Sequence, residues 1–242
     1  MNTITDRQRE WLDTLYKECM SEVEDSVAST SVFGDDYLCP DCDRITDKTK
    51  VHVLDMDIVN AAYYASKLSR GLGILNFGSY INPGAGSVDE RMLCEQSTLY
   101  PALESQTDRY YANHKDTAIG GDDVIHSSNI TLFSTPDVES NPIVVEVFTA
   151  SLCDLTKTND TVTAMAHMTR RMRKLYKLFN YTGCGTVVIS ANGCTEFGYN
   201  DLTIAQMWLM TMYDNPGLLK NVVFASTANP GSYKELFREY IL

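Results

Sequence analysis

Short apolar runs alternate with longer amphipathic stretches along most of the chain. Runs of apolar and β-branched residues predict strands at 51–54, 73–77, 130–133, 143–149, 186–190 and 221–226. Apolar residues spaced three and four apart predict helices at 7–27, 57–69, 87–99, 161–179, 202–213 and 233–240. The segments 28–50 and 110–121 carry turn residues and are expected to be irregular.

This alternation predicts an α/β fold with helices on both faces of a largely parallel or mixed sheet. Ligands of such folds bind beyond the carboxyl ends of the strands. Two glycine-bearing loops, 78–86 and 191–198, leave predicted strands at such ends and lead into helices. The sequence therefore favours a site formed by these two loops.

A glycine-rich loop before a helix can present backbone N–H groups to an anion, because glycine allows close approach and the helix end adds partial positive charge. Each loop alone is also compatible with a plain turn. Two such loops at neighbouring strand ends favour a phosphate site that needs no lysine or arginine.

The amino-acid composition excludes several classes of protein. The 242 residues include 44% hydrophobic residues, enough for one packed domain and too many for a disordered chain. No apolar run is long enough to span a bilayer and the first residues are polar, so we expect a cytoplasmic protein. The net charge of −12 argues against binding to nucleic-acid polymers or anionic membranes.

Seven cysteines, an odd number, are expected to be reduced thiols: Cys19, Cys39, Cys42, Cys94, Cys153, Cys184 and Cys194. Cys39 and Cys42 form a lone C-x-x-C pair. This pair could bind zinc with distant ligands, but without a second pair or a helical histidine pair a loop-forming or incidental role is favoured. We expect neither a metal ion nor a cofactor.

Several polar residues near the loops have two interpretations. Glu90 and Glu95 lie on the helix after the first loop, where they could complement the helix dipole or act as a general acid or base. Asn76 ends an apolar strand and could contact a ligand or fix a loop. Phe197 in the second loop could be core or could lie against a nucleoside.

Ordered motifs in the chain are similar to a known family. Residues 75–79 read L-N-F-G-S, 82–86 read N-P-G-A-G and 97–101 read S-T-L-Y-P. Residues 110–111 and 123–133 follow as Y-Y and D-V-I-H-S-S-N-I-T-L-F, and 190–200 as S-A-N-G-C-T-E-F-G-Y-N. In this order they resemble the microbial poly(ADP-ribose) glycohydrolase family, a divergent branch of the macrodomains.

The resemblance implies a three-layer α/β/α macrodomain-like domain over 51–242, with 1–50 as a helix and loop-rich lead-in packed on its core. It also implies an ADP-ribose ligand. The ligand-binding residues it suggests are Asp55 or Asp57 near the adenine, Asn76 at the distal ribose, Gly84, Ala85, Gly86, Asn192, Gly193, Cys194 and Thr195 in the glycine loops, and Phe197 at the ribose and diphosphate.

The chain departs from the family pattern at positions that the family uses for catalysis and ligand binding. Asp89, Glu90 and Arg91 align with the family's Q-E-E, so Arg91 stands where the family has its catalytic glutamate. Arginine cannot exchange a proton at neutral pH, although it binds phosphate oxygens well. Ala85 replaces a glycine of the first loop, and the second loop departs at Asn192 and Thr195.

Three hypotheses follow from these residues. The chain binds ADP-ribose or a related NAD-derived nucleotide, and sequesters it as a signal, with hydrolysis lost. Alternatively it is an active ADP-ribosyl glycohydrolase in which Glu90 or Glu95 serves as acid or base. A structural or interaction protein with a vestigial pocket is the third. The oligomeric state is left open.

Overall fold

The computed structural model describes residues 13–14, 17–114, 118–133, 141–190 and 192–240. Seven strands are present within these ranges: β1 Thr30–Phe33, β2 Lys50–Leu54, β3 Leu72–Gly78, β4 Val124–Leu132, β5 Ile143–Ser151, β6 Thr186–Ser190 and β7 Asn221–Ala225. The α-helices are α2 Met20–Ala28, α3 Ile58–Ala65, α4 Val88–Glu95, α5 Leu99–Glu104, α6 Ala112–His114, α7 Thr161–Tyr181, α8 Asp201–Asp214 and α9 Pro230–Leu236.

The seven strands form one mixed sheet in the order β1-β4-β5-β3-β6-β7-β2. The strands β5, β3, β6, β7 and β2 are parallel to their neighbours in that order. β4 runs antiparallel to both β5 and β1. The carboxyl ends of the parallel strands β3, β6, β7 and β2 therefore lie at one edge of the sheet.

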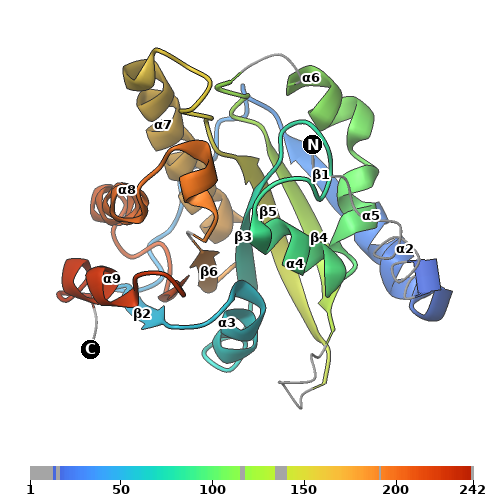
Figure 1. The fold of residues 1–242 in the computed structure, drawn as a ribbon. Helices are drawn as coiled ribbons and strands as arrows, with labels where there is room; N and C mark the ends of the chain where they lie inside the picture. Colours follow the sequence, from blue (N-terminus) through green and yellow to red (C-terminus); the bar gives the residue numbers. More distant parts are fainter. Residues whose placement is uncertain (1–12, 15–16, 115–117, 134–140, 191, 241–242) are drawn as a thin grey trace.

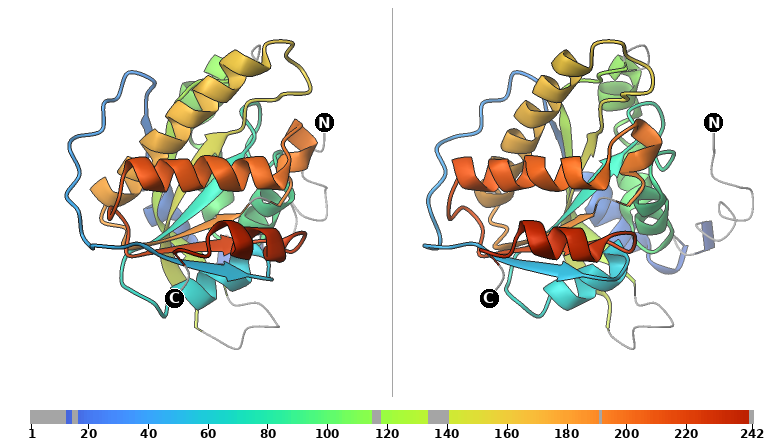
Figure 2. Two further views of the ribbon diagram at one scale, coloured as in Figure 1. Left: turned by 90° about the vertical axis from the view of Figure 1, so that its left-hand side faces the viewer. Right: turned by 60° about the vertical axis from the view of Figure 1, so that its left-hand side comes forward.

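Helices cover both faces of the sheet (Figure 1). On one face α3, α4 and α5 bury a core that includes Ile58, Leu93 and Ile74 of β3. On the other face α7, α8 and α9 bury a second core that includes Trp208 and Phe224 of β7. Figure 2 shows this second layer from its outer side. The predicted three-layer α/β/α fold with a mixed sheet is confirmed.

Helices on both faces of the sheet explain why the central strands appear in the sequence as continuous apolar runs. In β3 all seven residues are buried, because helices cover both faces of the strand. β6 and β7 are buried along their whole lengths for the same reason. Among the described residues, no helix is both long and apolar enough to cross a membrane.

Several predicted boundaries differ from the structure. The strand predicted over 130–133 begins at Val124, and α6, Ala112–His114, lies in a segment predicted to be irregular. The helices predicted over 57–69 and 233–240 are α3 and α9, which end at Ala65 and Leu236. Cys19, with φ −123° and ψ 41°, is the N-cap of α2, so the helix predicted over 7–27 is interrupted there; residues 1–12 and 15–16 lie outside the described residues. The helix predicted over 87–99 is two helices, α4 and α5. Residues 30–33, predicted to be irregular, pair with β4 as an edge strand.

Candidate functional site

Two loops meet beyond the carboxyl ends of β3 and β6. The first runs from β3 to α4, and the second leads through Gly193 into the 3-10 helix η2, Cys194–Phe197. A Cβ built on Gly193 would lie 3.0 Å from the Cβ of Ser87, the N-cap of α4. Gly193 has a φ of 85°, which favours glycine. The two glycine-bearing loops of the sequence therefore come into contact.

Two helices begin at this contact. The Ser87 side chain caps α4 by accepting from the Glu90 N–H at 3.2 Å. No described residue accepts a hydrogen bond from the N–H groups of Val88 and Asp89, or from that of Thr195 in η2. Such first-turn N–H groups have no partner within their own helix and are suited to an anion.

Glu90 is buried directly behind the first loop. Its Oε2 accepts from the backbone N–H groups of Ser79, at 3.0 Å, and Gly86, at 2.5 Å, so the carboxylate fastens both ends of the loop. A Cβ on Gly78 would lie 2.6 Å from Glu90 Oε1, and a Cβ on Gly86 would collide with Oε2. The loop needs glycine at both positions because the carboxylate fills the space.

The protonation of Glu90 follows from its burial. Burial raises the pKa of Glu90 to about 7, against the opposing effect of the N–H groups of Ser79 and Gly86. Its Oε1 has no hydrogen-bond partner among the described residues. A half-protonated carboxyl with an unused oxygen can donate or accept a proton near neutral pH.

Asn76 lies beside Glu90 on the buried strand β3. Its Nδ2 donates to Thr149 Oγ1 of β5 at 3.0 Å, and its amide also interacts with the Glu90 carboxyl. Its Oδ1 has no partner among the described residues. Asn76 therefore braces the carboxyl and still leaves one acceptor unused, so both sequence interpretations of this residue stay open.

Asp89 is a buried carboxyl that the sequence analysis does not single out as a site residue. It is 4% exposed, and burial raises its pKa to about 6 while hydrogen bonds from Ser190 and Asn192 oppose the shift. The charge of Asp57 raises it further. Asp89 thus faces the second loop, while Glu90 faces the first. The signal available in the sequence was its place beside Glu90 in the Q-E-E alignment.

The raised pKa values of Asp89 and Glu90 predict a pH dependence of stability. The folded protein retains protons that the unfolded chain releases near pH 4 to 5, so these groups stabilise the fold at low pH and this stability is lost as pH rises towards 7. We expect the free energy of unfolding to be about 1–2 kcal/mol larger at pH 5.5 than at pH 7.5.

Thermal midpoints at the two pH values check this expectation. Glu90→Gln should reduce the difference between pH 5.5 and pH 7.5, and the control Glu95→Gln, at the other end of α4, should retain it. An equal or lower midpoint at pH 5.5 in the unaltered protein would contradict the raised pKa values.

Arg91 is held by the first loop. Its Nη1 donates to the carbonyl oxygen of Gly86 at 3.0 Å, and the side chain is half-buried. The guanidinium therefore lies against the loop that follows β3, where its remaining N–H groups are available to an anion. Whether it binds a ligand stays a prediction.

Glu95 lies at the end of α4, away from Glu90. Five residues along an α-helix correspond to about 7.5 Å of rise and roughly 140° of rotation. Glu90 and Glu95 therefore do not share a face of α4, and the structure brings only Glu90 to the glycine loops.

The second loop is anchored from several sides. Asn192 Oδ1 accepts from the N–H and hydroxyl of Thr227, at 3.3 and 3.2 Å, which joins this loop to the segment after β7. Cys194 is buried, and burial raises the pKa of its thiol. Phe197 is half-buried and packs against the core beneath α7 and α8, which supports its interpretation as a packing residue.

The two acidic candidates after β2 differ. Asp57 caps α3, with Oδ1 accepting from Asn60 N at 2.8 Å, and it lies near enough to Asp89 to raise its pKa. Asp55 is exposed in the preceding turn. Asp57 thus belongs to the same edge of the sheet as the loops and has a structural role there.

The cysteine pair lies outside this site. Cys42 Sγ donates to the carbonyl oxygen of Lys177 on α7 at 3.4 Å, and Cys39 contacts Cys42. All seven cysteines are free thiols. The part of the chain that the structure describes contains no group of three His, Cys, Asp or Glu side chains that could hold a metal ion.

A comparison with protein families identifies the family of this chain. A model of the microbial-type PARG catalytic domain matches residues 13–135, about half of the chain. The chain belongs to the microbial-type poly(ADP-ribose) glycohydrolase family. The matched segment contains the first loop, Asp89, Glu90 and Arg91.

Solved structures agree with the family's fold. Poly(ADP-ribose) glycohydrolase from Deinococcus radiodurans, crystallised with ADP-ribose, is 22% identical with a TM-score of 0.81, covering 91% of this chain and 98% of that one. The enzyme from Thermomonospora curvata is 21% identical with a TM-score of 0.77, covering 91% and 89%. At this identity the likeness establishes the fold. A comparison with curated proteins gives no match.

Proposed function

We propose that the protein binds ADP-ribose or a related NAD-derived nucleotide across the carboxyl ends of β3, β6 and β7. The observation that carries this proposal is the contact between Gly193 and Ser87, which sets two helix starts with unused N–H groups side by side. These groups would receive the diphosphate. Asn76 and Glu90 would face the distal ribose, and Asp57 the adenosine.

The acidic composition is compatible with this ligand. Burial raises the pKa of Glu90 to about 7, so this carboxyl carries less than full negative charge at neutral pH, whereas Asp89, with a pKa raised to about 6, is mostly ionised there. Backbone N–H groups can therefore hold the diphosphate locally although the chain as a whole has a net charge of −12.

We further propose that hydrolysis is lost and that the protein sequesters its nucleotide. By the sequence resemblance Arg91 takes the position of the family's catalytic glutamate, and its Nη1 donates to the Gly86 carbonyl oxygen. An arginine there cannot transfer the proton that cleavage of a glycosidic bond requires, and general acid–base help is typically worth about 10²–10⁴-fold in rate. Both glycine-bearing loops that would bind the nucleotide are present at the carboxyl ends of β3 and β6.

Retention and release assays test this proposal together. The unaltered protein is incubated with an ADP-ribosylated protein, and bound and free ADP-ribose are then separated. Binding without multiple turnovers is expected. Catalytic release would contradict the loss of hydrolysis, and the absence of any binding would contradict the site itself.

One observation favours an active glycohydrolase as the second candidate. Glu90 has a pKa of about 7 and an Oε1 without a described partner, which suits a general acid. If Glu90 serves in this way, Glu90→Gln should lower the release rate by about 10²-fold or more while ADP-ribose binding persists. Glu95→Gln is the matched control and should leave release unchanged. Release that survives Glu90→Gln would exclude Glu90 as the acid.

Arg91 gives a separate prediction for binding. Arg91→Ala removes both a cation and the hydrogen bond to Gly86, so ADP-ribose affinity should fall by about tenfold. The exposed Arg109, which follows α5, is a matched control, and Arg109→Ala should bind normally. Unchanged affinity in Arg91→Ala, measured by calorimetry, would remove Arg91 from the site.

A further inference from the structure

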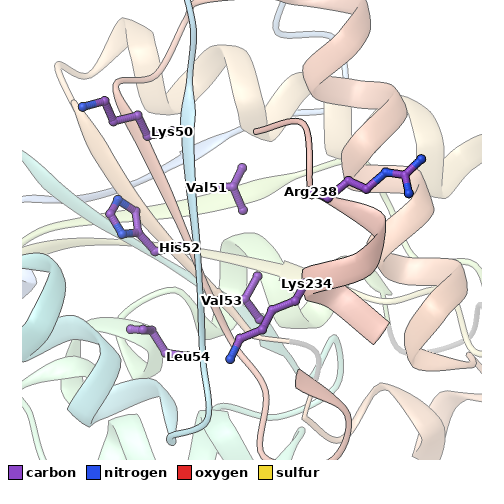
Figure 3. A pocket seen from close by; sticks show the side chains of 7 residues that line it. All are labelled: Lys50, Val51, His52, Val53, Leu54, Lys234 and Arg238. Atoms are coloured by element: carbon purple, nitrogen blue, oxygen red, sulfur yellow. The ribbon is translucent and has the colours of Figure 1, made fainter. Parts of the chain in front are cut away.

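The free edge of the sheet at β2 carries a groove that the proposed nucleotide site does not use. β2 pairs with β7 on one side and is the last strand of the sheet on the other. A groove of about 580 Å³ follows this strand and is lined by Lys50, Val51, His52, Val53, Leu54, Lys234 and Arg238 (Figure 3). It therefore runs along the whole strand.

The backbone of β2 has hydrogen-bonding groups to offer at this edge. Lys50 N donates to Lys220 O and Leu54 O accepts from Ser226 N, so the backbone N–H and C=O groups of these residues point towards β7. The backbone groups of successive residues in a strand face opposite edges, so the N–H and C=O groups of Val51 and Val53 point outwards from the free edge. Val51 N already donates to the carbonyl oxygen of Tyr240 at 3.1 Å, whereas Val53 N has no acceptor among the described residues beyond the sheet.

The side chains of the groove lie on both faces of β2. Lys50, His52 and Leu54 lie on the face of α3, where His52 Nδ1 is 3.3 Å from the Tyr64 hydroxyl. Val51 and Val53 lie on the other face, beneath α9. In Figure 3 Lys234 extends from α9 towards the strand, while the Arg238 guanidinium points away from it. A strand added beside β2 would alternate its own side chains between these two faces.

The charge of the groove is opposite to that of the protein. Lys50, Lys234 and Arg238 are exposed cations, and no acidic residue lines the groove, although the chain has a net charge of −12. Arg238 is paired with Glu235 on α9 at 3.2 Å, between two exposed side chains. No described carboxylate forms an ion pair with Lys50 or Lys234. These two ammonium groups, one on each face of the strand, are therefore available to a partner.

We propose that this edge binds an acidic, extended peptide segment, which adds to the sheet as a strand beside β2. Its backbone would pair with Val53 and the Val51 carbonyl, and its acidic side chains would reach Lys50 on one face and Lys234 on the other. Edge lysines discourage pairing with neutral or basic strands, including a second copy of β2. They favour an acidic strand, which gives the edge its specificity.

The test uses a fluorescein-labelled peptide rich in glutamate and valine, and a second peptide with a proline at its centre. Proline removes a ladder hydrogen bond without changing the charge, so the proline peptide should bind at least about threefold more weakly. Lys50→Ala/Lys234→Ala should weaken the first peptide by about tenfold. The control Lys67→Ala/Arg109→Ala, which removes two exposed cations outside the groove, should bind normally.

Hydrogen exchange of the Val53 amide separates strand addition from simple attraction of anions. Exchange should slow when the acidic peptide binds and should not slow with inorganic polyphosphate. The thermal midpoint of the double variant checks that it is folded. Equal binding of the proline peptide, normal binding by the double variant, or unchanged exchange at Val53 would each overturn the proposal. None of these outcomes depends on nucleotide binding.

Discussion

Replacing Gly86 with alanine is expected to abolish nucleotide binding and to lower the thermal midpoint by roughly 5–10 °C. The new Cβ would collide with Glu90 Oε2 and would lie 2.5 Å from Ser79 N. One atom would therefore displace the carboxylate that fastens both ends of the loop. The N–H groups at the start of α4 would move with it.

The neighbouring residue provides the control for this prediction. Ala85 lies in the same loop, and its N–H donates to Asn82 O at 3.3 Å. Ala85→Gly removes a methyl group and restores the glycine usual in the family, at a cost of about 1 kcal/mol or less. It should bind ADP-ribose normally. Thermal scans and calorimetry on both variants decide the matter, and a Gly86→Ala protein that binds normally would contradict the role given to Glu90.

Gly193→Ala is expected to weaken ADP-ribose binding by about hundredfold. Its Cβ would lie 3.0 Å from the Cβ of Ser87, so η2 and the start of α4 would be pushed apart. The N–H groups of Val88, Asp89 and Thr195 would then no longer converge. Calorimetry measures the loss directly.

Gly183 is a matched control for backbone strain. Its φ of 87° is close to the 85° of Gly193, and a Cβ built on it would have nothing within 4 Å. Both Gly183→Ala and Gly193→Ala should lose about 1–2 kcal/mol from the left-handed backbone, and Gly193→Ala should lose further stability from the contact with Ser87. Only Gly193→Ala should lose the ligand. Equal affinities in the two variants would show that the contact of the two loops does not matter for binding.

The strands and helices of the two cores could be predicted from the sequence because burial imposes their patterns. β6 matches its predicted range, 186–190, since helices cover both of its faces and every residue is apolar or small. α7 was predicted to two residues at its end from Met168, Met172 and Leu175, all of which are buried. In these elements the local pattern of apolar residues reflects which faces are buried in the folded protein.

The elements that could not be predicted depend on distant partners. β1 is four residues long and forms because Thr30 to Phe33 pair with β4. The helix predicted over 87–99 divides because Ser97 bridges to Leu132 and the Thr98 hydroxyl accepts from Thr131 N. Such serine and threonine hydrogen bonds compete with helix continuation, and no local periodicity signals them.

The candidate site could be predicted only in part, because some of its contacts also depend on residues that are distant in the sequence. The glycine loops and Glu90 could be found in the sequence, because a strand, a glycine-rich loop and a helix start are consecutive along the chain. The burial of Asp89 could not, since it comes from Ser190 and Asn192, a hundred residues later. The separation of Glu95 from Glu90 required the actual bounds of α4.

Calorimetric titration of the unaltered protein with ADP-ribose tests the central claim most directly, with AMP and ribose 5-phosphate as partial ligands. We expect one ADP-ribose per chain and much weaker binding of either fragment, because the paired loops hold a diphosphate that neither fragment has. The absence of binding heat with ADP-ribose at any accessible concentration, or equal binding of AMP, would contradict a diphosphate site between the two loops.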